Sequence, residues 1–226
     1  MLAPLNLVLV RHGVTDMTLT HALSGSGVPG PSLNAAGRVQ AAKAADAVYG
    51  IGRRSWVHLA PVSRVIASPM VRTQETAAAI GRRVGANIHT DERAREVHFG
   101  TWEGLTGDEV EQREGDAIVR WRAGEGAPEG GESFTDVAQR MESLVSDLAR
   151  EHAQLALAGD TTERTWVCVS HAVAIKCAVG VSLRMDVSAW GCVWPQPASV
   201  TILQLQVNDD GRIGERHLLC MGAPTD

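Results

Sequence analysis

Three short polar groups in this sequence each follow an apolar run and could together act on an anion. They are Arg11-His12, Ser68-Pro69 with Arg72 one helical turn later, and Ser170-His171. The planar guanidinium group of arginine pairs with phosphate oxygens through two parallel hydrogen bonds. A histidine among arginines is pushed toward its neutral form, which leaves a ring nitrogen able to attack. These residue types predict a phosphate-binding site with a nucleophilic histidine.

The apolar runs before these groups are predicted to be strands of one sheet. Residues 6–10 and 165–169 are mostly apolar, as in strands buried on both faces, and residues 63–67 form a further run. In an open α/β sheet, ligands bind in the crevice at the carboxyl ends of the strands. If the three strands are parallel neighbours, two histidines and two arginines converge there. The N-termini of the following helices would add positive dipole ends.

Helical patterns alternate with these strands. Helices are predicted over residues 35–49, 69–85 and 172–181, from about 106, and from 133. Asn34 is a candidate N-cap, Pro69 suits a first helical turn, and Ser133 with Asp136 resembles a capping box. A hairpin is expected around NDDG at residues 208–211. The alternation indicates an α/β fold with a mostly parallel sheet, and no linker divides it, so we expect one domain over residues 1–226.

Composition and charge indicate which classes of binding partner are not expected. The 226 residues have a formal net charge of −5 and no long basic block, so nucleic acid is not expected. The N-terminal apolar run at residues 7–10 is too short for a signal peptide or membrane span. The four cysteines lack zinc-site spacings, which favours free thiols in a reducing cytoplasm and neither a metal nor another cofactor. Oligomeric state is not encoded in any motif, and a homodimer stays open.

Each residue also has an ordinary structural interpretation. A single histidine at a strand end is more often a hydrogen-bonded structural residue, and an arginine on a helix is usually solvated. The joint placement at three strand ends favours the functional interpretation. Four tryptophans, Trp102, Trp121, Trp190 and Trp194, could form a substrate wall, but large aromatics mostly pack in cores. We expect at most two of them to contact substrate.

Five motifs, in order along the chain, resemble those of the histidine phosphatase superfamily, the phosphoglycerate-mutase-like family. They are Arg11-His12-Gly13 with Thr15, Ser68-Pro69 with Arg72 and Thr76-Ala77, Glu96 in EVHFGTWEG, Gly131-Glu132-Ser133, and Ser170-His171. They span residues 5 to about 205. The resemblance implies a three-layer α/β/α sandwich with a mostly parallel central sheet.

The resemblance also implies a metal-independent mechanism. His12 would attack phosphorus and form a phosphohistidine. Arg11, Arg72 and His171 would bind the phosphoryl oxygens. Glu96 would protonate the leaving alcohol and then deprotonate the water that hydrolyses the intermediate.

Four further residues are assigned to substrate binding. Thr18 stands where many members have asparagine, and its hydroxyl could still donate to phosphate. Ser24-Gly25 resembles a Ser-Gly pair of the family in the same loop. Ala172 replaces the glycine that often follows the second histidine, but it retains the backbone N–H.

The family contains mutases as well as phosphatases. Mutases bind the substrate carboxylate with basic residues from a longer insertion after the glutamate motif. Here residues 102–129 are short and acidic, and FGTWEGLT resembles the phosphatase branch. We therefore predict a phosphomonoesterase acting on small phosphorylated metabolites. A cofactor-dependent phosphoglycerate mutase is the first alternative, and a catalytically weak phosphate-binding scaffold is the second.

Overall fold

The computed structural model describes residues 2–225, which form one six-stranded sheet between two layers of helices. The strand order is β3-β2-β4-β1-β5-β6. Neighbours from β3 to β1 are parallel, whereas β5 pairs antiparallel with both β1 and β6. The strands are β1 (Leu5–Arg11), β2 (Val62–Ala67), β3 (Ile88–Thr90), β4 (Arg164–Ser170), β5 (Val200–Val207) and β6 (Ile213–Ala223). The predicted mostly parallel sheet and its terminal hairpin are confirmed.

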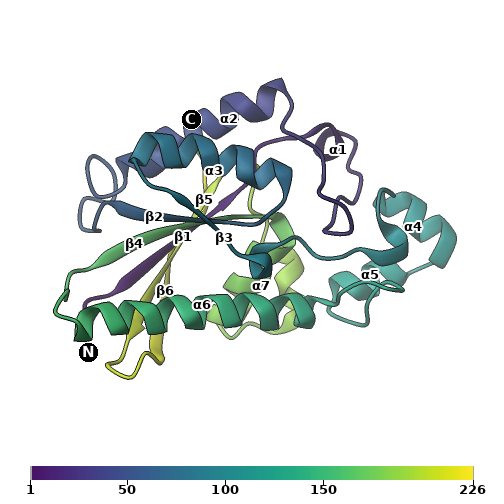
Figure 1. The fold of residues 1–226 in the computed structure, drawn as a ribbon. Coiled ribbons are helices and arrows are strands. Elements are labelled where there is room, and N and C mark those ends of the chain that lie inside the picture. Colours follow the sequence, from purple (N-terminus) through teal and green to yellow (C-terminus); the bar gives the residue numbers. More distant parts are fainter. Residues whose placement is uncertain (1, 226) are drawn as a thin grey trace.

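Helices cover both faces of the sheet, with α2 and α3 on one face and α6 and α7 on the other (Figure 1). The α-helices are α1 (Asp16–Leu19), α2 (Ala35–Gly50), α3 (Val71–Val84), α4 (Gly107–Glu114), α5 (Ala117–Arg122), α6 (Phe134–Leu157) and α7 (Ala172–Ser182). Three short 3-10 helices are η1 (Glu92–Ala94), η2 (Gly100–Trp102) and η3 (Val187–Cys192). The three-layer architecture follows the expectation.

The central strand β1 contributes to both hydrophobic cores. Its residues alternate between the two faces, so Leu7 and Leu9 pack on the α6 and α7 side, while Val8 and Val10 pack on the α2 and α3 side. All four side chains are buried. A strand buried on both faces reads as a continuous apolar run, which is why residues 6–10 show no polar alternation.

Helix starts agree with the capping signals except at Pro69. Asn34 and Ser133 are the N-caps of α2 and α6, each accepting a backbone N–H through its side chain. Helix α3 begins at Val71 rather than Pro69, because Met70 has extended backbone and the Val71 N–H donates to the Pro29 carbonyl. Pro69 therefore lies before the helix.

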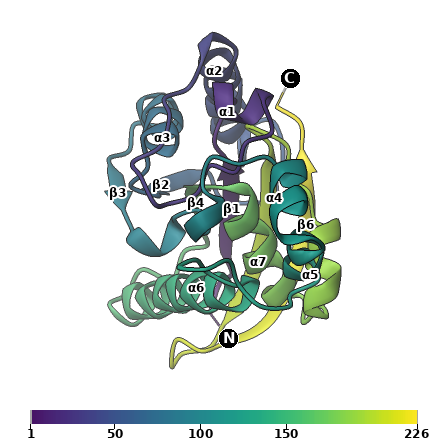
Figure 2. The ribbon, with the colours of Figure 1, turned by 90° about the vertical axis from the view of Figure 1, so that its right-hand side faces the viewer.

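The carboxyl ends of β1, β4 and β2 point toward the side of the molecule that carries α1, α4 and α5. Figure 1 shows these short helices beyond that edge of the sheet, and Figure 2 views the molecule from that end. The loop after β1 passes close to α2 because residue 37 is glycine. A Cβ on Gly37 would lie 2.0 Å from the Val14 carbonyl oxygen. This close approach places the segment after His12 firmly against the helix layer.

No helix in the described part of the chain is both long and apolar enough to cross a bilayer. All four cysteines are free thiols, and Cys168 and Cys177 are buried. The expected free thiols are thus confirmed.

Candidate active site

The three predicted strand ends meet at one edge of the sheet. Strand β4 lies between β1 and β2. In the sheet register Arg11 pairs with Ser170, and Ala67 pairs with Val169. The backbone N–H of His12 donates to the Ser170 carbonyl at 3.1 Å. The predicted convergence is therefore confirmed, and parallel pairing is its cause.

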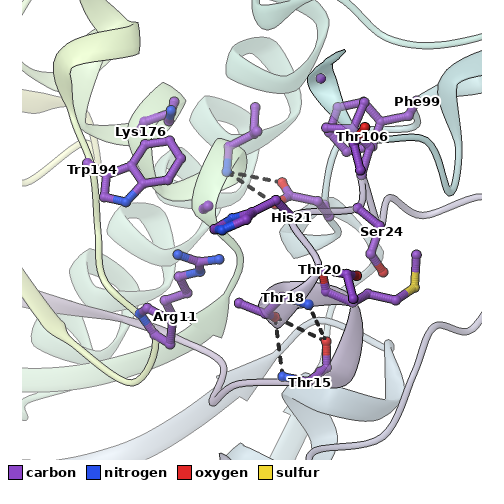
Figure 3. A pocket seen from close by; sticks show the side chains of 18 of the residues that line it. Arg11, Thr15, Thr18, Thr20, His21, Ser24, Phe99, Thr106, Lys176 and Trp194 are labelled. Carbon is purple, nitrogen blue, oxygen red and sulfur yellow. Dashed lines mark hydrogen bonds between the residues drawn. The ribbon is translucent and has the colours of Figure 1, made fainter. Parts of the chain in front are cut away.

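A cavity of about 760 Å³ lies at this edge. Seven of the nine predicted site residues line it: Arg11, His12, Thr18, Ser24, Arg72, Glu96 and Ala172. Figure 3 shows Arg11, Lys176 and Trp194 on one side of the cavity, with Thr15, Thr18, Thr20 and Ser24 toward the other. The predicted residues outside this lining are His171 and Gly25.

His12 is held in one tautomer by its hydrogen bonds. Its Nδ1 lies 2.7 Å from the Gly13 carbonyl oxygen, which can only accept, so Nδ1 carries the proton. Its Nε2 accepts a hydrogen bond from Arg72 Nε at 3.1 Å. Burial, followed by the charges of Arg72 and Arg11, holds the pKa of His12 well below its usual value. The ring is thus neutral, with the Nε2 lone pair directed toward the arginine side.

Arg72 and Arg11 retain donors with no protein partner. Arg72 is 1% exposed, and its Nη2 donates to the Ser24 carbonyl at 2.8 Å, while its buried Nη1 is unpaired. Arg11 Nη1 donates to the Pro195 carbonyl at 3.0 Å, and its buried Nε is unpaired. Burial lowers the pKa of Arg72 to about 10, so this group is a cation at neutral pH, and burial also lowers the pKa of Arg11. Unpaired buried donors beside a cavity suit the oxygens of an anion.

His171 lies beside His12, although its ring does not line the cavity. The two ring centroids are 5.1 Å apart. Its Nε2 is 2.8 Å from the Ser68 hydroxyl, and its Nδ1 is buried without a partner. Burial and the nearby Arg72 keep the pKa of His171 well below the usual value, so this ring is also neutral.

The Glu96 carboxylate sits at the N-terminus of α7. Oε1 accepts from the backbone N–H groups of Val97, Val173 and Ala174, and Oε2 accepts from that of Val173, at 3.0 to 3.2 Å. A helix N-terminus stabilises negative charge. The helix that follows His171 therefore fixes the predicted acid–base residue beside the cavity.

The segment that carries Glu96 is clamped by Arg140 of α6. The Arg140 guanidinium donates to the carbonyls of Arg93, Arg95 and Glu96 at 2.7, 2.7 and 3.0 Å. It also pairs with Glu132, whose Oε2 accepts from the His98 N–H at 2.8 Å. The Gly131-Glu132-Ser133 motif thus supports the glutamate segment. Sequence reasoning missed Arg140, because nothing in its own helix distinguishes it from a solvated arginine.

The predicted binding residues differ in how they face the cavity. Thr18 forms a capping box with Thr15 at the start of α1, and both line the cavity. The Ser24 hydroxyl is buried and unpaired, and Ala172 lines the cavity at the start of α7. Gly25 faces away, since its N–H donates to Glu103 Oε1 at 2.6 Å. Gly25 therefore positions the loop instead of lining the site.

Sequence reasoning also missed Lys176, which lines the cavity from α7 and is 5% exposed. The available signal was a single charged residue within the apolar run AVAIKCAVGV. Trp121 and Trp194 line the cavity, whereas Trp102 and Trp190 are buried in the core. Trp121 also belongs to that core, with 4% exposure, and the number of tryptophans that contact substrate stays a prediction.

Within residues 2–225, no three His, Cys, Asp or Glu side chains are grouped as a metal site would require.

Comparison with known proteins matches the chain to a family model, to curated relatives and to solved structures. The family model described as "Histidine phosphatase superfamily (branch 1)" matches residues 7–213. A glucosyl-3-phosphoglycerate phosphatase of Mycobacterium tuberculosis is 33% identical over 185 residues, covering 81% of this chain and 78% of that protein. A phosphoserine phosphatase 1 of Hydrogenobacter thermophilus is 25% identical over 202 residues, covering 88% and 86%.

Solved structures agree with these sequence matches. The native mycobacterial glucosyl-3-phosphoglycerate phosphatase has a TM-score of 0.81 and 30% identity, covering 97% of this chain and 99% of that chain. A complex of the same enzyme with inorganic phosphate has a TM-score of 0.76 and 30% identity, covering 97% and 98%.

Proposed function

This chain belongs to branch 1 of the histidine phosphatase superfamily and is a phosphatase, and we propose that it hydrolyses small phosphorylated metabolites through a phosphohistidine on His12. Arg11, Arg72 and His171 bind the phosphoryl oxygens. Glu96 protonates the leaving alcohol and then deprotonates the attacking water. The reaction needs neither a metal ion nor another cofactor.

The observation that supports this proposal most directly is the environment of His12. The Gly13 carbonyl holds the Nδ1 proton, and Arg72 approaches Nε2 at 3.1 Å. A phosphoryl group bound by Arg72 would therefore lie close to the unprotonated nitrogen. In-line transfer depends on such positioning, because a preset geometry removes most of the entropic barrier.

The substrate we propose is a phosphomonoester with a sugar-sized or smaller alcohol part. The relatives named above act, by their names, on glucosyl-3-phosphoglycerate and phosphoserine. A cavity of about 760 Å³ has room for a ligand of that size. The unpaired hydroxyl of Ser24, together with Thr18, offers hydrogen bonds to hydroxyl groups of such a ligand.

The test is release of inorganic phosphate from p-nitrophenyl phosphate, with EDTA, by the wild type and His12→Ala. We expect turnover that resists EDTA and falls at least about 10³-fold in the variant, because the nucleophile is lost. Rapid acid-free denaturation of the wild type during turnover should trap a base-stable, acid-labile phosphoenzyme that His12→Ala lacks.

Two results would contradict the proposal. Activity that survives in His12→Ala would exclude His12 as the nucleophile. Phosphoryl transfer from 3-phosphoglycerate to give 2-phosphoglycerate, faster than phosphate release, would instead identify a mutase.

A further inference from the structure

A single peptide group lies between the side chains of Glu103 and Arg72. The N–H of Gly25 donates to Glu103 Oε1 at 2.6 Å. The carbonyl of the same peptide bond, that of Ser24, accepts from Arg72 Nη2 at 2.8 Å. A Cβ on Gly25 would lie 2.6 Å from Glu103 Oε2, so glycine lets the carboxylate approach the peptide this closely. The carboxylate and the guanidinium group thus bind opposite ends of one peptide.

The Ser24 carbonyl is one of two acceptors that orient the Arg72 guanidinium. Among the described residues, the Arg72 side chain donates to His12 Nε2 and to the Ser24 carbonyl, while its Nη1 is buried and unpaired. Under the proposed function His12 Nε2 forms the bond to phosphorus, so it can then no longer accept from Arg72. Of these two acceptors, the Ser24 carbonyl alone then remains to orient the guanidinium group against the phosphoryl oxygens.

The Glu103 carboxylate can strengthen the bond between Ser24 and Arg72. Its contact with the Gly25 N–H is short, as in hydrogen bonds to ionised acceptors. Hydrogen bonds in a chain polarise one another, so an anion at the N–H makes the carbonyl a better acceptor. Burial lowers the pKa of Arg72, and the charges of Glu96 and Glu103 oppose that effect.

The loop that contains this peptide is also held by its backbone. Segments 23–26 and 97–105 are joined by three backbone hydrogen bonds at 2.7 to 3.1 Å, from Leu23 to Leu105, from Gly104 to Leu23 and from Ser26 to Val97. The loop therefore keeps its place without the Glu103 side chain, which is left to set the plane of one peptide.

We propose that Glu103 is a positioning residue that fixes the Ser24–Gly25 peptide and thereby holds the Arg72 guanidinium in the orientation that binds the phosphoryl group. The inference rests on the proposed function, since Arg72 is assigned there to the phosphoryl oxygens. Glu103 does not line the cavity, so it acts on the substrate through this peptide.

The experiment measures binding of inorganic phosphate to the whole chain by calorimetry. Glu103→Leu removes the acceptor and the charge, so Kd should rise about 10-fold. Glu103→Gln keeps an acceptor oxygen without the charge, so Kd should rise about 3-fold. Glu111→Leu is the matched control, because Glu111 is exposed on α4, and its Kd should equal that of the wild type.

A variant at Arg72 separates positioning from a general disturbance of the site. Arg72→Lys keeps the positive charge but lacks the planar fork of donors. If Glu103 acts through Arg72, adding Glu103→Leu to Arg72→Lys should change Kd less than about 2-fold, because changes along one chain of contacts are not additive. In ¹⁵N NMR spectra, the Nε–H resonance of Arg72 should shift in both Glu103 variants and stay in place in Glu111→Leu.

An unchanged phosphate affinity in Glu103→Leu would overturn the inference, and so would a full loss of affinity that persists in the Arg72→Lys background. Lower thermal stability of Glu103→Leu with the Kd of the wild type would also overturn it, since Glu103 would then hold only the loop. If the leucine variant does not fold, Glu103→Gln with and without Arg72→Lys makes the same comparison.

These measurements do not depend on turnover. A wild type that binds phosphate through Arg72 but hydrolyses no phosphomonoester would refute the proposed function and leave this inference supported.

Discussion

At the scale of single residues, His12 owes its reactive form to its neighbours. The Gly13 carbonyl selects the tautomer, and burial with two arginines disfavours the imidazolium. The same arginines that would bind the phosphoryl group thus keep the nucleophile unprotonated. Binding and activation are coupled through one set of charges.

This coupling predicts a measurable change in Arg72→Gln. Arg72 is the nearest cause of the lowered pKa after burial, so its loss should raise the pKa of His12 toward the ordinary value. NMR titration of the ¹⁵N-labelled imidazole would detect the change. Arg82→Gln, on the exposed face of α3, should leave the His12 titration unchanged. An unaltered His12 pKa in Arg72→Gln would show that burial alone controls it.

At the scale of elements, helix α6 positions the Glu96 segment through one side chain. Arg140 joins three backbone carbonyls and Glu132, and it is only 12% exposed. Those carbonyls belong to the 3-10 helix η1 and to the segment that follows it, neither of which is part of the sheet. Without the guanidinium group the three carbonyl oxygens would lose these hydrogen bonds, and the segment that carries Glu96 would shift.

Arg140→Met should therefore lower kcat roughly 10-fold to 100-fold, because small displacements of a proton donor reduce the rate strongly. KM should change less, since within the described residues the only cavity residue to which Arg140 donates a hydrogen bond is Glu96, at its backbone carbonyl. The free energy of unfolding should fall by about 2 kcal/mol. Steady-state kinetics and urea unfolding would measure both effects.

Arg150→Met on the same helix is the matched control, because Arg150 is exposed and makes a surface ion pair with Asp147. Both kinetics and stability should be close to wild type. A loss of stability in Arg140→Met with normal kcat would mean that the clamp is structural only.

At the scale of the whole molecule, the site makes stability depend on pH. The folded chain holds the pKa of His12 and His171 well below 6.5, whereas the unfolded chain has the ordinary value. Below pH 6.5 the unfolded state therefore binds protons that the folded state does not. Stability from these groups is complete above pH 6.5 and is lost as the pH falls toward the folded values.

We expect His12 and His171 together to lower the free energy of unfolding by roughly 2 to 3 kcal/mol between pH 7.5 and 5.5, since each contributes about 1.4 kcal/mol per pH unit below 6.5. The buried His152, whose pKa burial also lowers, adds to that drop. Most carboxyl groups stay ionised over this range. Urea unfolding at the two pH values would measure the drop, and His171→Gln should reduce it by about 1.4 kcal/mol. Equal stability at both pH values would contradict the assignment of two neutral, buried rings.

The sequence by itself determined the alternation of strands and helices and the residues placed at three strand ends. An apolar run and its polar ending are local features, and the parallel pairing of such runs brings their carboxyl ends together. The positions of His12, Arg72 and His171 could therefore be predicted, whereas Glu96 was assigned only through the resemblance to a family. The cavity gathers His12, Arg72 and Glu96, and His171 lies directly beside it.

Only the tertiary structure decided which groups surround these residues. Lys176 meets Trp194, and Arg140 meets the Glu96 segment, through contacts between stretches that are far apart in the chain. The direction of Gly25 toward Glu103 and the approach of Arg72 to His12 Nε2 also depend on partners outside their own strand or loop. Periodicity encodes which face of an element is buried, but it does not encode which distant side chain that face will contact.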